Sequence, residues 1–327
     1  MSARMQYRQI PGVAVPVARL VLGTMIVTTQ ERERSFALLD AVYEQGGNAF
    51  DTANVYAGGH SERCLGEWLQ ARGVREQVFI LTKGCHPNQD RQRVTPFDLT
   101  TDLYDSLARL RTDYVDAYVL HRDNIDVPVG EIVDVLNLHY AAGRIRAFGG
   151  SNWSHVRIAE ANAYAARQGL APMTVSSPNY GLAEQVLDPW GPGCVSISGP
   201  ANAAARAWYA ANQMPVFAYS SLARGLFSGR LRRDNLDQAE QLLDKAARTA
   251  YLHEVNLRRL DRVAQLAAER GCTVPQLALA YVLHSPLNVF PLVGAANGSE
   301  FAENVQALDL HLTADECAWL DLARDGR

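Results

Sequence analysis

The feature that most constrains the fold of this chain is a regular alternation of eight short apolar runs with helix-like segments. In chain order the runs are Leu20–Met25, Ala49–Ala53, Val78–Lys83, Tyr114–His121, Ile145–Asn152, Thr174–Tyr180, Val216–Ser221 and Val289–Ala295. Short runs that are apolar almost throughout are typical of parallel strands buried on both faces. Eight strand–helix repeats in 327 residues predict a single (β/α)8 TIM barrel rather than a doubly wound sheet.

The segments between the runs carry helix signals. Thr95 is an expected N-cap, followed by Pro96 at the first helical position and Asp98 in the first turn. The apolar stripe of this helix consists of Leu99, Leu103, Leu107 and Leu110. Later helices are expected to begin after Thr273 and Thr313, the second being an additional C-terminal helix. Glycines stand where helix C-caps are expected, at Gly46, Gly143 and Gly271.

The rest of the chain fits one barrel domain spanning residues 1–327. Residues Tyr7–Arg19, with the turn signal Pro11-Gly12, predict a small N-terminal hairpin across the bottom of the barrel. No linker or low-complexity tract divides the sequence. The first run contains a single glycine, Gly23, and no Gly-x-Gly-x-x-Gly fingerprint follows it, which disfavours a Rossmann domain.

Composition narrows the classes of partner and compartment. A formal net charge of −4 gives no basic field for nucleic acid or an anionic membrane. No stretch approaches the roughly 18 apolar residues that a membrane span needs. The five cysteines are scattered without a Cys-x-x-Cys pair, so we expect reduced thiols, no metal site and a cytoplasmic location. A homo-oligomer is compatible with the sequence, which does not fix the oligomeric state.

Four chemically distinctive residues follow or end three of the runs: Asp51, Tyr56, Lys83 and His121. The carboxyl ends of all strands of such a barrel meet at one face, so these side chains are expected to converge. A carbonyl that accepts hydride develops negative charge on oxygen and needs a proton. We therefore predict that Tyr56 donates this proton and that the Lys83 ammonium lowers its pKa. Asp51 would anchor Lys83, and His121 would orient the carbonyl oxygen.

The sequence around these residues resembles the aldo-keto reductases over nearly its whole length. Phe50–Gly66 is similar to the catalytic signature of that family, and Gly143–Asn152 to its nicotinamide-carboxamide strand. Ala218–Gly225 resembles the pyrophosphate loop, and Gly294 through Asn304 resembles the segment that binds the adenosine phosphate. The resemblance implies an NAD(P)H-dependent carbonyl reductase that holds its cofactor, NADP(H) or NAD(H), across the carboxyl face of the barrel.

The same resemblance implies a set of cofactor contacts. Ser151 and Asn152 would bind the carboxamide, with Ser177 where the family usually has glutamine, and Tyr180 would stack on the nicotinamide. The remaining implied contacts are Ser220, Leu222 and Gly225 at the pyrophosphate, and Gly294, Asn297, Ser299 and Asn304 at the adenosine end. Asn297 and Glu300 stand where the family usually carries basic residues that pair with the 2′-phosphate. Local chemistry therefore favours NAD, whereas the habit of the family favours NADP.

Polar loops point to the substrate, a small carbonyl compound. Hydrogen-bonding residues follow the third and fourth runs, at His86, Asn88, Gln89, Asp90, Arg91 and Arg93, and at Arg122, Asp123 and Asn124. We therefore expect a polyhydroxylated, carbohydrate-derived aldehyde or ketone, with Trp190 of the Gly/Pro-rich loop Gly181–Gly199 covering a sugar ring. Two alternatives remain: a cofactor-binding regulatory subunit with little turnover, and a barrel metal hydrolase using His86, His121, Asp123 and Asp51.

Overall fold

The computed structural model describes residues 4–327, and eight parallel strands close into a barrel. Around the barrel these are β3 (Val21–Gly23), β4 (Ala49–Asp51), β5 (Phe79–Gly84), β6 (Val115–Leu120), β7 (Ile145–Ser151), β8 (Val175–Ser177), β9 (Val216–Ala218) and β10 (Val289–Val293). Strand β10 pairs with β3 and so closes the ring. Each predicted run coincides with one strand, and the predicted (β/α)8 fold is confirmed.

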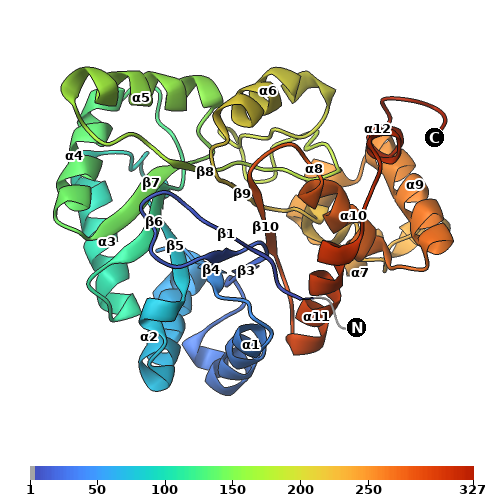
Figure 1. Cartoon of the computed structure of the whole chain (residues 1–327), viewed down its shortest axis with the longest axis horizontal. Coiled ribbons are helices and arrows are strands. Elements are labelled where there is room, and N and C mark those ends of the chain that lie inside the picture. The colour runs from blue at the N-terminus through green and yellow to red at the C-terminus, as the bar shows by residue number, and fades with distance from the viewer. Residues whose placement is uncertain (1–3) are drawn as a thin grey trace.

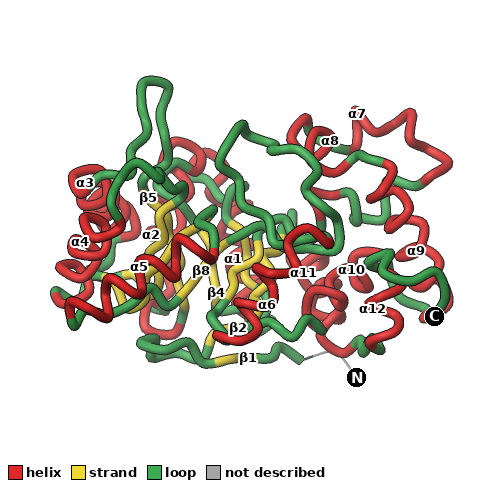
Figure 2. Tube along the Cα trace, turned by 90° about the horizontal axis from the view of Figure 1, so that it is seen from above, coloured by secondary structure: helices red, strands yellow, loops and turns green. Residues whose placement is uncertain are grey.

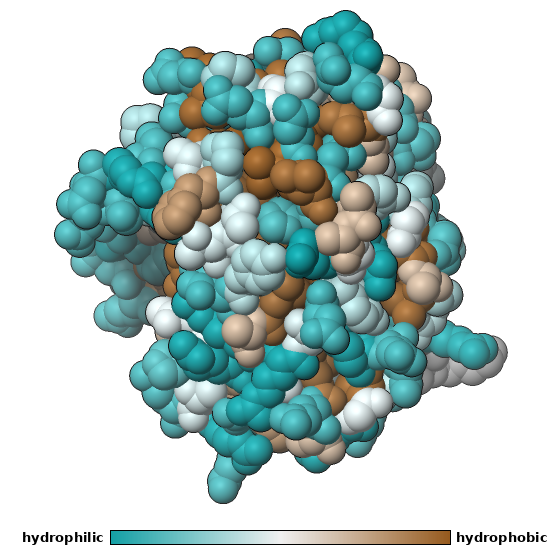
Figure 3. Space-filling model, turned by 90° about the vertical axis from the view of Figure 1, so that its left-hand side faces the viewer, coloured by the Kyte–Doolittle hydropathy of each residue, from teal (hydrophilic) through white to brown (hydrophobic). Residues whose placement is uncertain are grey.

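Helices surround the strands (Figure 1). They are α1 (Arg32–Glu44), α2 (His60–Arg72), α3 (Pro96–Leu110), α4 (Val129–Ala141), α5 (His155–Gln168), α6 (Ala203–Asn212), α7 (Ala239–Leu242), α8 (Lys245–Tyr251), α9 (Glu254–Arg270), α10 (Val274–Leu283), α11 (Gly298–Gln306) and α12 (Ala314–Leu320). The predicted N-caps Thr95, Thr273 and Thr313 each accept a hydrogen bond from the third residue beyond them. The outer face formed by α3, α4 and α5 is mostly hydrophilic, with separate hydrophobic patches (Figure 3).

The two ends of the barrel differ. The predicted hairpin is present as antiparallel β1 (Tyr7–Arg8) and β2 (Val17–Ala18), and it lies across one end of the barrel. Long loops gather at the opposite end (Figure 2). Near the amino-terminal ends of their strands, Phe79 stacks on Phe217 and Phe217 on Phe290, with ring centroids 5.3 and 5.1 Å apart. These rings pack together inside the barrel, towards the end that the hairpin covers. The polar side chains described below lie at the opposite end, where the strands terminate.

Candidate active site

All four predicted catalytic residues meet at the carboxyl end of the barrel. Asp51 is the last residue of β4, Lys83 lies near the end of β5, and His121 directly follows β6. Tyr56 begins a short helical turn, Tyr56–Gly59, that connects β4 to α2. The barrel thus brings together side chains that are far apart in the sequence because each one stands at the same end of its strand.

The Lys83 ammonium is the centre of the cluster. Its Nζ donates to Asp51 Oδ1 at 2.6 Å, to the Thr52 carbonyl oxygen at 2.9 Å and to the Tyr56 hydroxyl oxygen at 3.1 Å. Because the phenol oxygen accepts this bond, its own hydrogen stays available for another acceptor. The Tyr56 and His121 rings meet edge to face with centroids 5.9 Å apart, so both face the same space.

Burial sets the protonation of these groups. Burial raises the pKa of Tyr56 by more than the Lys83 charge lowers it, so the tyrosine is a protonated phenol at neutral pH. The prediction from the sequence was that Lys83 would lower the pKa of Tyr56. Lys83 does act in that direction, but the burial of the ring, which the sequence does not show, has the larger effect. Burial alone would lower the pKa of Lys83, but Asp51 and Tyr56 outweigh it and raise that pKa. Burial, reinforced by Lys83, holds the pKa of His121 far below its usual value, so its imidazole is neutral.

A second buried ion pair holds the turn that carries Tyr56. Arg109 of α3 donates to the Asn54 carbonyl oxygen at 2.8 Å and reaches Glu62 of α2 at 3.3 Å. Glu62 also accepts a hydrogen bond from Thr82, next to Lys83, at 2.6 Å. Gly59 has a φ of +87°, and a Cβ there would lie 2.8 Å from the Arg109 guanidinium carbon. The glycine therefore lets the guanidinium approach the turn that carries Tyr56, a support that could not be foreseen from the sequence.

Residues predicted to bind the nicotinamide carboxamide lie side by side on β7 and β8. Ser151 pairs with Ser177 in the strand register, and its hydroxyl donates to the Ser177 carbonyl oxygen at 2.8 Å. The Ser177 hydroxyl is buried without a hydrogen-bond partner. Asn152 donates to the His121 carbonyl oxygen at 3.1 Å, which ties this set to the catalytic cluster. The Asn152 Oδ1 already accepts from Val195 N and the Tyr219 hydroxyl, so the Ser177 hydroxyl is the group of this set that is free to bind a carboxamide.

The structure does not direct Tyr180 towards this set. Its side chain is buried and lines a pocket with Tyr281, Ser285 and Cys317, among the outer helices α10 and α12 and the chain after α10. The aromatic residue that reaches Asn152 is Tyr219, whose hydroxyl donates to Asn152 Oδ1 at 2.7 Å. Tyr219 directly follows β9, so its position at a strand end was the signal that the sequence analysis overlooked.

The segments predicted for the phosphates have conformations that suit anions. After β9 the backbone has positive φ at Ser220, Ala223, Arg224 and Gly225, and such turns form concave groups of N–H donors. Leu222 lies within this turn. After β10, the Asn297 side chain caps α11 by accepting from Glu300 N at 3.0 Å, with Ser299 exposed in the first turn. Asn304 of the same helix donates to the Gly294 carbonyl oxygen at 3.4 Å.

Comparison with known proteins identifies the family. A model of the aldo/keto reductase family matches residues 19–325. The chain belongs to this family. It is similar to an NADP(+) aryl-alcohol dehydrogenase of Phanerodontia chrysosporium, with 26% identity over 97% of this chain and 85% of the relative. It is also similar to norsolorinic acid reductase A of Aspergillus parasiticus, with 27% identity over 95% of this chain and 79% of the relative. The chain is therefore an NAD(P)-dependent oxidoreductase.

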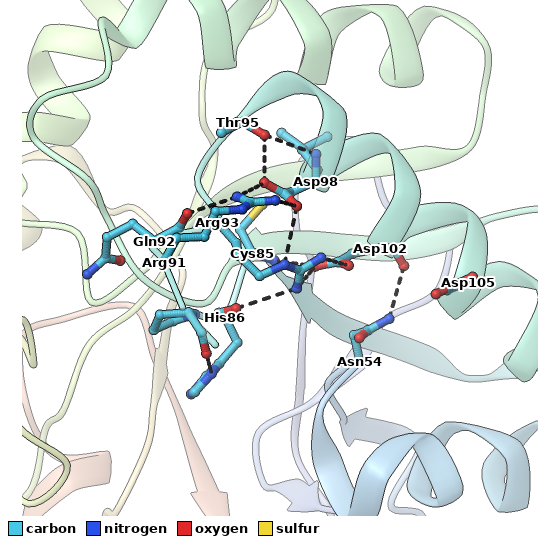
Figure 4. Close-up of polar contacts among 12 residues, drawn as sticks. Asn54, Cys85, His86, Arg91, Gln92, Arg93, Thr95, Asp98, Asp102 and Asp105 are labelled. Carbon is cyan, nitrogen blue, oxygen red and sulfur yellow. Dashed lines mark hydrogen bonds and ion pairs between the residues drawn. The ribbon is translucent and has the colours of Figure 1, made fainter. Parts of the chain in front are cut away.

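In this aldo/keto reductase, much of the polar loop after β5 is already occupied by contacts with α3 (Figure 4). Arg91 forms a double ion pair with Asp98 at 2.7 and 2.8 Å. Arg93 forms another with Asp102 at 2.6 and 3.0 Å, and Asp102 also accepts from the Cys85 backbone N–H at 2.8 Å. Asp123 likewise pairs with Arg157. The prediction of a polyhydroxylated substrate rested on free hydrogen-bonding groups in these loops, and several of those groups are paired within the protein.

Apolar side chains are exposed on three of the loops at the catalytic end of the reductase. Met25 and Ile26 follow β3, and Val55 directly precedes Tyr56. Trp190 belongs to the loop after β8 and is 46% exposed, with its ring 6.1 Å from that of Tyr219. That loop is fixed to the barrel, because Asn179 pairs with both Ser196 and Tyr219.

Two further properties of the reductase concern metals and membranes. Among residues 4–327 there is no group of three or more histidine, cysteine or acidic side chains arranged to hold a metal ion. His86 and His121 do approach each other, with centroids 4.8 Å apart, but Lys83 stands beside them. None of the helices described here has the length and apolar character to span a membrane.

Proposed function

We propose that the protein reduces aromatic aldehydes or ketones with NADPH and that Tyr56 donates the proton to the carbonyl oxygen. The observation that carries this proposal is the Lys83–Tyr56 hydrogen bond of 3.1 Å, in which the phenol oxygen is the acceptor. The phenol hydrogen is then free for a substrate carbonyl oxygen. Asp51 and Thr52 hold the ammonium in place, so the donor needs little rearrangement as the reaction proceeds.

The division of labour follows from the protonation states. When bound, the nicotinamide supplies the hydride that reaches the carbonyl carbon. Tyr56, a phenol at neutral pH, gives its proton to the oxygen as negative charge develops there. Lys83 then stabilises the phenolate that remains. His121, neutral because of its burial, can hold the carbonyl oxygen by a hydrogen bond without competing as an acid.

An aromatic substrate is favoured by the side chains around the catalytic end. Met25, Ile26, Val55 and Trp190 are exposed on three loops around that end, and apolar side chains exposed around a site are suited to contact an aromatic ring. Two relatives are named for aryl alcohols and norsolorinic acid, which is consistent with this class. A carbohydrate-derived aldehyde is the competing prediction, and it rests on loop groups that largely have partners within the protein.

We propose NADP(H) rather than NAD(H) as the cofactor. Glu300 Oε2 accepts a hydrogen bond from Ala296 N at 2.8 Å, so its carboxylate turns back on its own helix end. This orientation weakens the argument that Glu300 would repel a 2′-phosphate. The relative from Phanerodontia chrysosporium is named for NADP(+).

The test is a reductase screen with NADPH and NADH separately. Benzaldehyde, 4-nitrobenzaldehyde and acetophenone are compared with glyceraldehyde and xylose under identical conditions. We expect kcat/KM with NADPH to be at least tenfold higher for the aryl aldehydes than for the sugars. The reverse order would restore the carbohydrate prediction. Absence of turnover with every carbonyl compound, despite cofactor binding, would favour the regulatory-subunit alternative.

A further inference from the structure

Arg122 is a nearly buried cation at the catalytic end. It directly follows His121, and its side chain is only 8% exposed. Its Nη1 donates to the His121 carbonyl oxygen at 2.9 Å, and its Nη2 lies 4.0 Å from Cys194 Sγ. Neither neighbour carries a negative charge that would balance the guanidinium, and a guanidinium has five N–H donors.

No carboxylate within residues 4–327 forms an ion pair with Arg122. Of the other two buried arginines, Arg259 has two carboxylate partners, whereas Arg19, which follows β2 of the hairpin, has no ion pair among the described residues. The adjacent Asp123 is taken by Arg157. Asp188 raises the pKa of Cys194 and Tyr219, which Arg122 lowers, so it lies in the same region, but its carboxylate accepts a hydrogen bond from Gln185 and forms no ion pair with Arg122. A buried charge without a partner is costly, which makes this site suited to an anion that arrives with a ligand.

Arg122 lies close to the space in which the substrate carbonyl would bind. Its charge lowers the pKa of Tyr56 and of His121, so it lies within electrostatic reach of both catalytic rings. Its guanidinium carbon is 5.9 Å from the centre of the Trp190 ring, on the loop after β8. An aromatic molecule whose carbonyl meets Tyr56 could therefore extend an anionic substituent to Arg122 with its ring beside Trp190. Arg224, also near Trp190, is paired with Asp244.

We propose that Arg122 binds a carboxylate of the substrate, so that the preferred substrates are aromatic aldehydes or ketones bearing an acid group. This inference rests on the proposed aryl-carbonyl reductase function and specifies its substrate class. A guanidinium recognises a carboxylate with two parallel N–H···O bonds, a geometry that an ammonium cannot reproduce. Shielding of the pair from water by Trp190 would strengthen it.

The test compares each carboxybenzaldehyde isomer with its methyl ester. The ester keeps the ring and aldehyde but removes the charge, so the ratio of kcat/KM for acid and ester isolates recognition of the anion. We expect at least one isomer to show a ratio of ten or more in the wild type, mainly through KM. Arg122→Gln should reduce that ratio at least tenfold, and Arg122→Lys should give an intermediate ratio.

Two controls separate recognition from architecture. Arg91→Gln removes the same charge from a neighbouring loop but affects a guanidinium already paired with Asp98, so the ratio should stay within twofold of the wild type. A purely structural role of Arg122 would lower kcat/KM for acid and ester equally and leave the ratio unchanged, which would overturn the proposal. So would a tenfold loss of NADPH affinity in Arg122→Gln with no change in the ratio, since Arg122 would then serve the cofactor phosphates.

Measurements on the wild type alone distinguish failure of the Arg122 proposal from failure of the proposed aryl-carbonyl reductase function. Turnover of the neutral esters with an acid-to-ester ratio at or below one for every isomer would overturn the role of Arg122 while supporting an aryl-carbonyl reductase. Absence of turnover with acids and esters alike would overturn both proposals.

Discussion

Replacing Tyr56 with phenylalanine should separate proton transfer from folding and from cofactor binding. The change removes one oxygen, which accepts a hydrogen bond from Lys83 Nζ at 3.1 Å. The ammonium keeps its bonds to Asp51 at 2.6 Å and to Thr52 at 2.9 Å, and the phenyl ring keeps its place below the cation. Loss of a single hydrogen bond to a charged group costs about 1.5–3 kcal/mol of unfolding free energy.

The effect on catalysis should be much larger. General acid catalysis typically contributes about 10²–10⁴-fold, so kcat should fall by that factor. The dissociation constant of NADPH should change by less than about twofold, because the proton is needed only as charge develops in the transition state. The assay is steady-state and single-turnover reduction followed by NADPH absorbance, with urea denaturation and cofactor titration of the same preparation.

Lys83→Met is the informative comparison. It leaves Asp51 buried with no partner on either oxygen, since its Oδ2 already has none. Breaking a buried ion pair costs about 3–5 kcal/mol, so this variant should lose both stability and activity, whereas Tyr56→Phe should lose chiefly activity. A Tyr56→Phe enzyme that keeps more than about a tenth of the wild-type kcat would remove Tyr56 from the acid role.

Three further outcomes are expected. Glu300→Arg should raise the NADPH-to-NADH preference at least tenfold, about 1.4 kcal/mol, whereas Glu303→Arg on the same helix should not; equal effects would show a general charge effect. Asp102 holds both Cys85 and Arg93 in the loop after β5. Asp102→Asn should therefore raise KM more than it lowers kcat and should reduce the free energy of unfolding by about 1–3 kcal/mol. An unchanged KM would show that this loop does not take part in substrate binding. We expect Tyr219 rather than Tyr180 to stack on the nicotinamide, so Tyr219→Leu should weaken NADPH binding about tenfold, while Tyr180→Leu should leave the affinity of the folded protein unchanged; the opposite pattern would return the stacking role to Tyr180.

The barrel and the convergence of the four predicted residues at its carboxyl end could be foreseen from the sequence because both depend on local patterns. Short buried strands are visible as apolar runs, and every parallel strand of a barrel ends at the same face. Once Asp51, Lys83 and His121 stand at strand ends, their convergence follows without knowledge of any particular contact. The caps at Thr95, Thr273 and Thr313 were equally local, since each involves residues three positions apart.

Only the tertiary structure decided which polar side chains are paired within the protein and which are left to bind a ligand. Arg93 and Arg122 look alike in the sequence, each in a loop at the catalytic end. Arg93 meets Asp102 of α3, whereas Arg122 is buried without an acid. In the same way, Tyr180 turns towards the outer helices while Tyr219 reaches Asn152. Such outcomes depend on which side chain of another element lies opposite, and therefore on packing between segments that are distant in the sequence.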